Sequence, residues 1–219
     1  MAYNVNFNLV LKYIPDFVKG LGLGLWLAAI SLLIGMVIGI LIAYCAISKV
    51  KALKHFASGY VTVLRNIPLL VLTFFCYFGL PDWGLLLSKH ASFVFALSLY
   101  AGAYLAEVFR AGLEAIPKGI IEAGAAIGLR RAQIMWHIQM PIMFKNVLPS
   151  LSNNFISLFK DTSLASSIAV VELTYLARKV NTITFRVIEV WLIVGAMYVA
   201  ACYIIGFGLR LVERKFRIQ

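Results

Sequence analysis

The side chains best suited to chemistry lie close together in one otherwise apolar stretch of the chain. Lys160 offers a group that binds anions, and the adjacent Asp161 offers one that binds cations, so together they match a zwitterionic solute. Asn153 and the hydroxyl groups of Thr162 and Ser163 supply neutral hydrogen bonds. Polar groups at membrane depth are costly unless they face protein or a water-filled cavity. The stretch therefore predicts a site for a small polar solute.

A structural role for the same charges stays open. Adjacent side chains on a helix point about 100° apart, so Lys160 and Asp161 need not face one ligand. Each of them could instead pair with another helix or lie at the outer membrane interface. For Arg65, and for Glu107 with Arg110, structural or gate-region ion pairs are favoured. Glu107 and Arg110 are three residues apart and therefore share one helical face.

A second constellation occupies residues 122–141, in the middle of the chain. Its small residues favour a helix, and Gly128 fits a helix break or C-cap. Residues 130–140 are expected to form another short helix that ends before Pro141. Two short helices around a glycine corner make a projecting knuckle that could enter a groove in a partner protein. The alternative is a solvated loop between spans, but the segment is long for such a connection.

Composition shows what surrounds these residues. Apolar residues make up 62% of the chain and charged residues 13%, whereas soluble domains have about 45–50% and about 25%. The solvent must therefore be mostly lipid. The net charge of +11 does not predict nucleic-acid binding, because the basic residues flank apolar spans without interleaved aromatic residues. The cysteines and histidines are scattered, so we expect no metal site and no disulfide framework, and no catalytic residue is predicted.

The apolar segments predict an all-α, polytopic membrane protein with five transmembrane helices, forming a single domain over residues 1–219. In the first span, which carries no charge over 29 residues, Gly35 and Gly39 indicate close helix packing. The second span is expected to kink at Pro68 and to end in a turn. The five predicted spans cover residues 20–48, 58–80, 91–110, 144–164 and 190–209, and residues 170–186 are expected to form an amphipathic surface segment.

Five spans place the two termini on opposite sides of the membrane. The loop after the first span, the central segment of residues 117–143 and the C-terminal tail share one side, and that side holds more Lys and Arg. The positive-inside rule therefore predicts that the N-terminus is outside and the C-terminus is cytoplasmic. The N-terminus lacks the basic region of a signal peptide, so we expect the first span to be retained.

Four motifs resemble one family. EAGAAIGL at residues 122–129, followed by I-x-M-P at residues 138–141, resembles the EAA loop of permease subunits in ABC importers. Residues 65–81, 104–119 and 148–173 are similar to permeases for polar amino acids, of the histidine, glutamine and glutamate type. Gly124 stands where the family has alanine, and Met140-Pro141 stands for the usual Leu-Pro. Both changes conserve small or apolar character.

The resemblance implies the type I importer fold in a bacterial inner membrane, with membrane lipid around it. It implies an ABC ATPase dimer, a second permease subunit that is identical or homologous, and an extracytoplasmic amino acid binding protein. Glu122, Ala123 and Gly128 would then be the coupling residues. Glu122 would make a polar contact, Ala123 would permit close approach, and Gly128 would turn the chain.

The expected function is translocation of a polar amino acid by alternating access. No G-x-x-x-x-G-K-[ST] motif occurs, so the chain is not expected to be an enzyme on its own, and the partner ATPase would bind ATP and Mg. Two other classes remain as alternatives. A secondary transporter would show more spans and inverted repeats. A membrane scaffold subunit would not need Lys, Asp and Asn at membrane depth.

Overall fold

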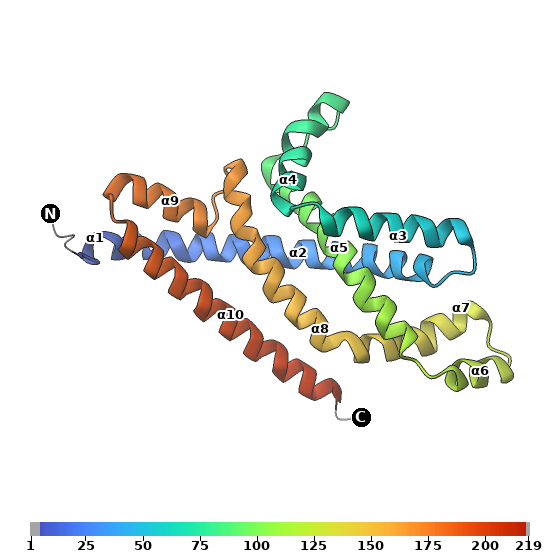
Figure 1. The fold of residues 1–219 in the computed structure, drawn as a ribbon. Helices are drawn as coiled ribbons and strands as arrows, with labels where there is room; N and C mark the ends of the chain where they lie inside the picture. The colour runs from blue at the N-terminus through green and yellow to red at the C-terminus, as the bar shows by residue number, and fades with distance from the viewer. Residues whose placement is uncertain (1–4, 218–219) are drawn as a thin grey trace.

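The computed structural model describes residues 5–217, and all of its elements are helices (Figure 1). Three helices are each long and apolar enough to cross a membrane, namely α2 (Ile14–Ala46), α5 (Lys89–Glu114) and α10 (Val187–Arg217). A fourth span is possible if α3 (Lys51–Asn66) and the segment Leu69–Trp83 count as one bent pair. The all-helical membrane fold is confirmed. The remaining predicted span, α8 (Met140–Asp161), has the length of a span, but its polar residues lower its hydropathy.

The buried core is centred on α5, which packs against α2 on one side and α8 on the other. The close packing predicted from the two glycines is confirmed at the α2–α5 crossing. A Cβ added at Gly35 would lie 2.7 Å from the Cβ of Ala101, and one at Gly39 would lie 2.9 Å from the Cβ of Leu105. The two helix backbones can approach this closely only because neither position carries a side chain.

The second predicted span is broken at Ile67 and Pro68, as the sequence indicates. α3 and the segment Leu69–Trp83 meet at 101°. Ile67 is extended, with ψ of 128°, which is the conformation that a following proline favours. Beyond the bend lie α4 (Leu69–Phe74), a π-helical turn η1 (Phe75–Gly79) and a 3-10 turn η2 (Leu80–Trp83). The predicted turn is confirmed there, and Gly84 closes it with φ of +85°.

The expectation that a short helix ends before Pro141 is wrong. Helical structure continues without a break through α7 (Arg131–Ile134), the π-helical turn η3 (Met135–Gln139) and α8. Pro141 falls in the first turn of α8, where a missing backbone N–H is tolerated. The π-helical turn directly before it changes the hydrogen-bond register. One helical path therefore joins the central segment to Asp161.

At the other end of the molecule, a 3-10 helix η4 (Thr162–Ile168) leads into α9 (Leu173–Thr184), which is the predicted amphipathic segment. The buried carboxylate of Glu172 caps α9 by accepting hydrogen bonds from the backbone N–H groups of Thr174 and Tyr175, each at 2.8 Å. α9 packs on the N-terminal part of α2 and on α10. α9 and α6 (Lys118–Ala126) lie at opposite ends of the helix bundle (Figure 1).

Candidate functional site

The central segment forms a knuckle of two helical pieces around a glycine corner, in agreement with the predicted geometry. α6 ends at Ala126, and Gly128, two residues later, has a φ of +84° that is readily accessible only to glycine among ordinary residues. The Leu129 N–H donates to the Gly124 carbonyl at 3.1 Å, and the Gly128 N–H donates to the Ala125 carbonyl at 3.0 Å. This pair of bonds is the Schellman motif that terminates helices. It fixes the direction in which the chain turns toward α7.

The second half of the knuckle begins at α7, and the side chain of Gln133 caps this helix. Its Oε1 accepts a hydrogen bond from the Arg130 backbone N–H at 2.8 Å, which caps the start of α7. Gly124 is buried against the η3 side of the knuckle, so α6 lies close to η3. The knuckle is thus packed on itself rather than being an open loop.

The knuckle exposes both a charged side chain and large apolar side chains. Glu122 and Ala123 are exposed, and within residues 5–217 Glu122 makes no hydrogen bond or ion pair. Ile127 is 78% exposed and Trp136 is 61% exposed. Large exposed apolar side chains beside a free carboxylate are typical of a protein docking surface. The coupling role of Glu122, Ala123 and Gly128 stays a prediction.

The five candidate residues of the polar stretch do not converge on one point. Asn153 and Lys160 are exposed and share one face of α8 with Ser157, at spacings of four and three residues. Lys160 lines a groove of about 450 Å³ between α8 and α10, together with Tyr198 and Arg210. Asn153 and Lys160 are therefore brought to one face.

Asp161 is half-buried at the end of α8, about 100° around the helix from Lys160. Thr162 is fully buried, and its hydroxyl donates to the Phe159 carbonyl at 2.6 Å. Ser163 is half-buried, and its carbonyl accepts a hydrogen bond from the Ser166 hydroxyl. Among the described residues Lys160 and Asp161 therefore make no ion pair, and the Thr162 hydroxyl is bonded within the helix itself.

A second polar constellation lies between α3 and α5, and Arg65 stands at one end of it. The guanidinium carbon of Arg65 lies 5.0 Å from the ring centre of Tyr104, a cation–π distance. The Tyr104 hydroxyl accepts a hydrogen bond from the Tyr100 hydroxyl at 3.2 Å. Within the described residues, Arg65 makes no ion pair with a carboxylate. Arg65, Tyr104 and Tyr100 thus form a row of contacts that begins at a cation with no ion-pair partner among the described residues.

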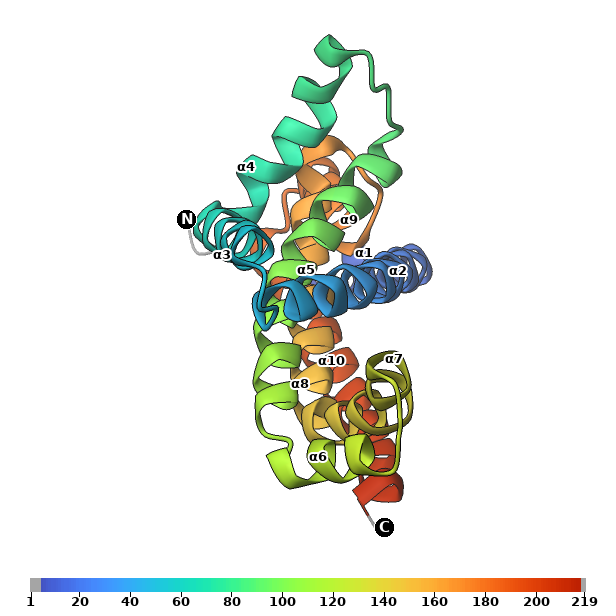
Figure 2. The ribbon, with the colours of Figure 1, turned by 90° about the vertical axis from the view of Figure 1, so that its right-hand side faces the viewer.

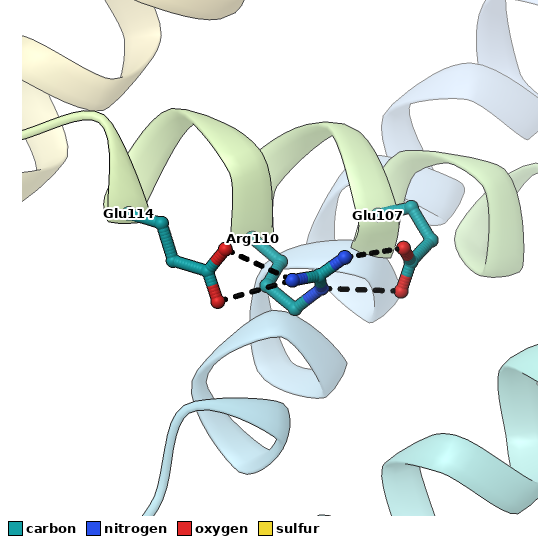
Figure 3. Close-up of polar contacts among 3 residues, drawn as sticks. All are labelled: Glu107, Arg110 and Glu114. Atoms are coloured by element: carbon teal, nitrogen blue, oxygen red, sulfur yellow. Dashed lines mark hydrogen bonds and ion pairs between the residues drawn. The ribbon is translucent and has the colours of Figure 1, made fainter.

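Arg65 also lines an open cavity of about 650 Å³ between α2, α3 and α5. On its wall the Arg110 guanidinium binds Glu107 at 2.7 Å and Glu114 at 2.9 Å (Figure 3). The predicted Glu107–Arg110 pair is confirmed. Sequence reasoning missed Glu114 and Tyr104, although Glu114 follows Arg110 at a spacing of four residues, which predicts an additional ion pair.

The chain is similar to known membrane transport proteins over nearly its whole length. The profile of the family described as binding-protein-dependent transport system inner membrane component matches residues 35–218. A probable glutamine ABC transporter permease, GlnM of Bacillus subtilis (strain 168), is 33% identical over 96% of this chain and 98% of the relative. The arginine transport system permease ArtQ of the same organism is 32% identical over 98% of each chain.

Solved structures agree with these relatives. A crystal structure of an amino acid ABC transporter with histidines contains a chain that is 34% identical, with a TM-score of 0.87, over 97% of this chain and 100% of that one. The inward-facing MetNI methionine ABC transporter is 21% identical, with a TM-score of 0.79, over 94% of this chain and 98% of that one. The second similarity concerns the fold alone.

Proposed function

Because the chain belongs to the family of inner membrane components of binding-protein-dependent transport systems, we propose that it translocates a polar amino acid into the cell by alternating access. It is a permease subunit of an amino acid ABC importer. The glutamine and arginine named for its relatives favour a polar substrate. The whole chain acts as one transmembrane domain.

The energy comes from partner subunits that bind ATP and Mg, since this sequence has no phosphate-binding loop. An ABC ATPase dimer binds the knuckle of residues 117–143, and a second permease subunit completes the pathway. An extracytoplasmic binding protein delivers the amino acid at the end that carries α9. The knuckle and the end of α10 lie at one end of the molecule (Figure 2), which supports a cytoplasmic C-terminus and an N-terminus outside.

Within the knuckle, each predicted coupling residue has a distinct task. The exposed carboxylate of Glu122 binds a polar group of the ATPase, and Ala123 lets the two surfaces approach closely. Gly128 sets the angle between α6 and α7. Movement of the ATPases reaches the membrane through the unbroken helical path from α7 to Asp161.

One observation carries the substrate assignment. The Arg65 guanidinium stacks on Tyr104 and makes no ion pair with a carboxylate in residues 5–217. A guanidinium in this setting is suited to bind the carboxylate of an amino acid. Asp161, a half-buried carboxylate at the end of α8, is the partner for the ammonium group. Asn153, Lys160 and Ser163 remain pathway candidates, whereas the buried hydroxyl of Thr162 supports helix packing.

Substrate binding to the purified permease–ATPase complex, without the binding protein, tests this assignment. Calorimetry would compare glutamine or arginine with the matching amine that lacks the carboxylate. The wild-type complex should prefer the amino acid, and Arg65→Ala should lose about tenfold in affinity, equal to about 1.4 kcal/mol. Lys54→Ala, in the same cavity wall, is the matched control. Equal losses in both variants, or no preference for the carboxylate, would contradict the assignment.

A further inference from the structure

The groove between α8 and α10 opens on the surface of the molecule, apart from the polar cavities beside α3. It has a volume of about 450 Å³, and Lys160 lines it from α8. On α10 its wall includes Val199, Tyr203, Gly206 and Arg210, whose spacing of i, i+4, i+7 and i+11 puts them on one helix face. Val199 is 71% exposed and Tyr203 is 70% exposed. The groove therefore runs along an open face of α10.

This part of α10 is apolar enough to lie against lipid. No charged side chain occurs from residue 190 to residue 209, a length that spans the hydrocarbon core as a helix. α10 is also the least buried of the three helices that could each cross a membrane. Only 17% of its apolar stretch is buried, against 33% for α2 and 61% for α5. A ligand of the groove should therefore have an apolar part.

The groove is basic near the C-terminal end of α10, which is the end that carries the knuckle (Figure 2). Arg210 lines the groove there, and Arg214 follows four residues later on the same face of α10. Both side chains are exposed. Among the described residues neither forms an ion pair, although Glu213 is close to both in sequence, and no carboxylate lines the groove. Two cations are thus available to an anionic group at this end.

Gly206 brings the Arg210 cation next to the apolar wall. Helical side chains lean toward the N-terminus of their helix, so Arg210 extends back along α10. A Cβ added at Gly206 would lie 3.8 Å from Nη1 of Arg210 and 3.4 Å from Cδ1 of Ile156 on α8. One turn farther along α8, Lys160 can lay its apolar stem along the wall and keep its ammonium group in polar surroundings. The groove therefore suits a molecule that is anionic at one end and apolar along the rest.

We propose that the α8–α10 groove binds one anionic phospholipid, with its phosphate group at Arg210 and Arg214 and an acyl chain against Ile156, Val199 and Tyr203. Basic pockets between transmembrane helices bind anionic headgroups, and a guanidinium can donate two hydrogen bonds to one phosphate. A zwitterionic lipid should bind more weakly, because its own cation offsets the phosphate. The lipid site goes beyond the proposed function, since it requires neither the amino acid nor the binding protein.

Native mass spectrometry of the detergent-purified permease–ATPase complex tests the site. The complex would be titrated with dioleoyl-phosphatidylglycerol and, separately, with dioleoyl-phosphatidylcholine, which has the same acyl chains. Phosphatidylglycerol should bind more tightly, and Arg210→Gln should weaken its binding by about fivefold, the effect of one basic residue near an anionic headgroup. Lys215→Gln is the matched control, because this exposed cation is five residues from Arg210 and therefore on another face of α10. It should leave the affinity unchanged.

Protection of Cys202 locates the lipid, because this cysteine lines the groove. With Cys45 and Cys76 replaced by alanine, Cys202 is the remaining cysteine of the chain and can be alkylated by N-ethylmaleimide in the same complex. Phosphatidylglycerol should slow the alkylation, and it should do so less in Arg210→Gln. Glycerol phosphate, which has the anionic group but no acyl chain, should give no protection.

Several results would overturn the proposal. Equal affinity for the two lipids would show that the headgroup charge is not recognised, and equal losses in Arg210→Gln and Lys215→Gln would show a diffuse attraction to the basic tail. Equal protection of Cys202 by glycerol phosphate would mean that the groove binds a free phosphate group. If Cys202 reacts in the isolated chain but not in the lipid-free complex, a partner subunit covers the groove instead of a lipid.

Discussion

Ile138 occupies the space that a side chain at Gly124 would need, since an added Cβ would lie 2.7 Å from its Cδ1 atom. This contact sets the distance between α6 and η3. Gly124→Leu should therefore separate the two halves of the knuckle and lower the ATP hydrolysis that binding protein stimulates in the complex. Gly119→Leu is the matched control, because α6 offers open space at Gly119. Equal loss in both variants would show that the packing of Gly124 does not matter for coupling.

Gly128→Pro should abolish transport while the protein remains in the membrane. Proline fixes φ near about −65°, whereas Gly128 has φ of +84°, so the corner must take another shape. Glu122→Ala should act in the same direction but more mildly, because it removes one polar contact. Affinity purification of the ATPase with each variant measures the effect. If both variants retain the ATPase and support full stimulated hydrolysis, the coupling assignment is wrong.

Asp161→Asn should lower uptake more than it lowers basal ATP hydrolysis. The variant loses the negative charge proposed to bind the substrate ammonium, and we expect about a tenfold loss, equal to about 1.4 kcal/mol. Lys160→Ala should show a smaller fall, because Lys160 lines the separate groove beside α10. Protein amount must be measured with uptake, since loss of one member of a structural pair reduces folded protein instead. Normal uptake per molecule in Asp161→Asn would remove this residue from the pathway.

The topology can be checked by labelling single cysteines in intact cells. With Cys45, Cys76 and Cys202 replaced, a cysteine at position 51 or 131 should be shielded from a membrane-impermeant reagent. A cysteine at Asp82, in the turn after η1, should react. The expected pattern follows from the excess of basic residues on the side of the knuckle. The opposite pattern would reverse the orientation.

Features with local physical causes could be predicted from the sequence. Pro68 predicts a kink, the pair Gly35 and Gly39 predicts close helix packing, and the spacing of Glu107 and Arg110 predicts an ion pair. The structure contains all three. Each depends on residues a few positions apart, whose geometry a helix fixes by itself.

Features that depend on distant segments were missed or misjudged. Arg65 and Tyr104 lie on different helices, and only the packing of α3 against α5 brings the cation over the ring. The prediction that a helix ends before Pro141 was wrong. A π-helical turn, which has no clear sequence signal, changes the hydrogen-bond register just before the proline, so the helix continues. Thr162 is polar in sequence, yet its position after α8 turns its hydroxyl to the Phe159 carbonyl.

The central claim is that ATP hydrolysis by partner subunits drives amino acid import through this chain. The most direct measurement is uptake of labelled glutamine or arginine into proteoliposomes that contain the permease, its ATPases and the binding protein. Uptake should require ATP on the side of the knuckle, should survive ionophores that remove ion gradients, and should stop in Gly128→Pro. Uptake that runs on an ion gradient without ATP, or that continues unchanged in Gly128→Pro, would contradict the account.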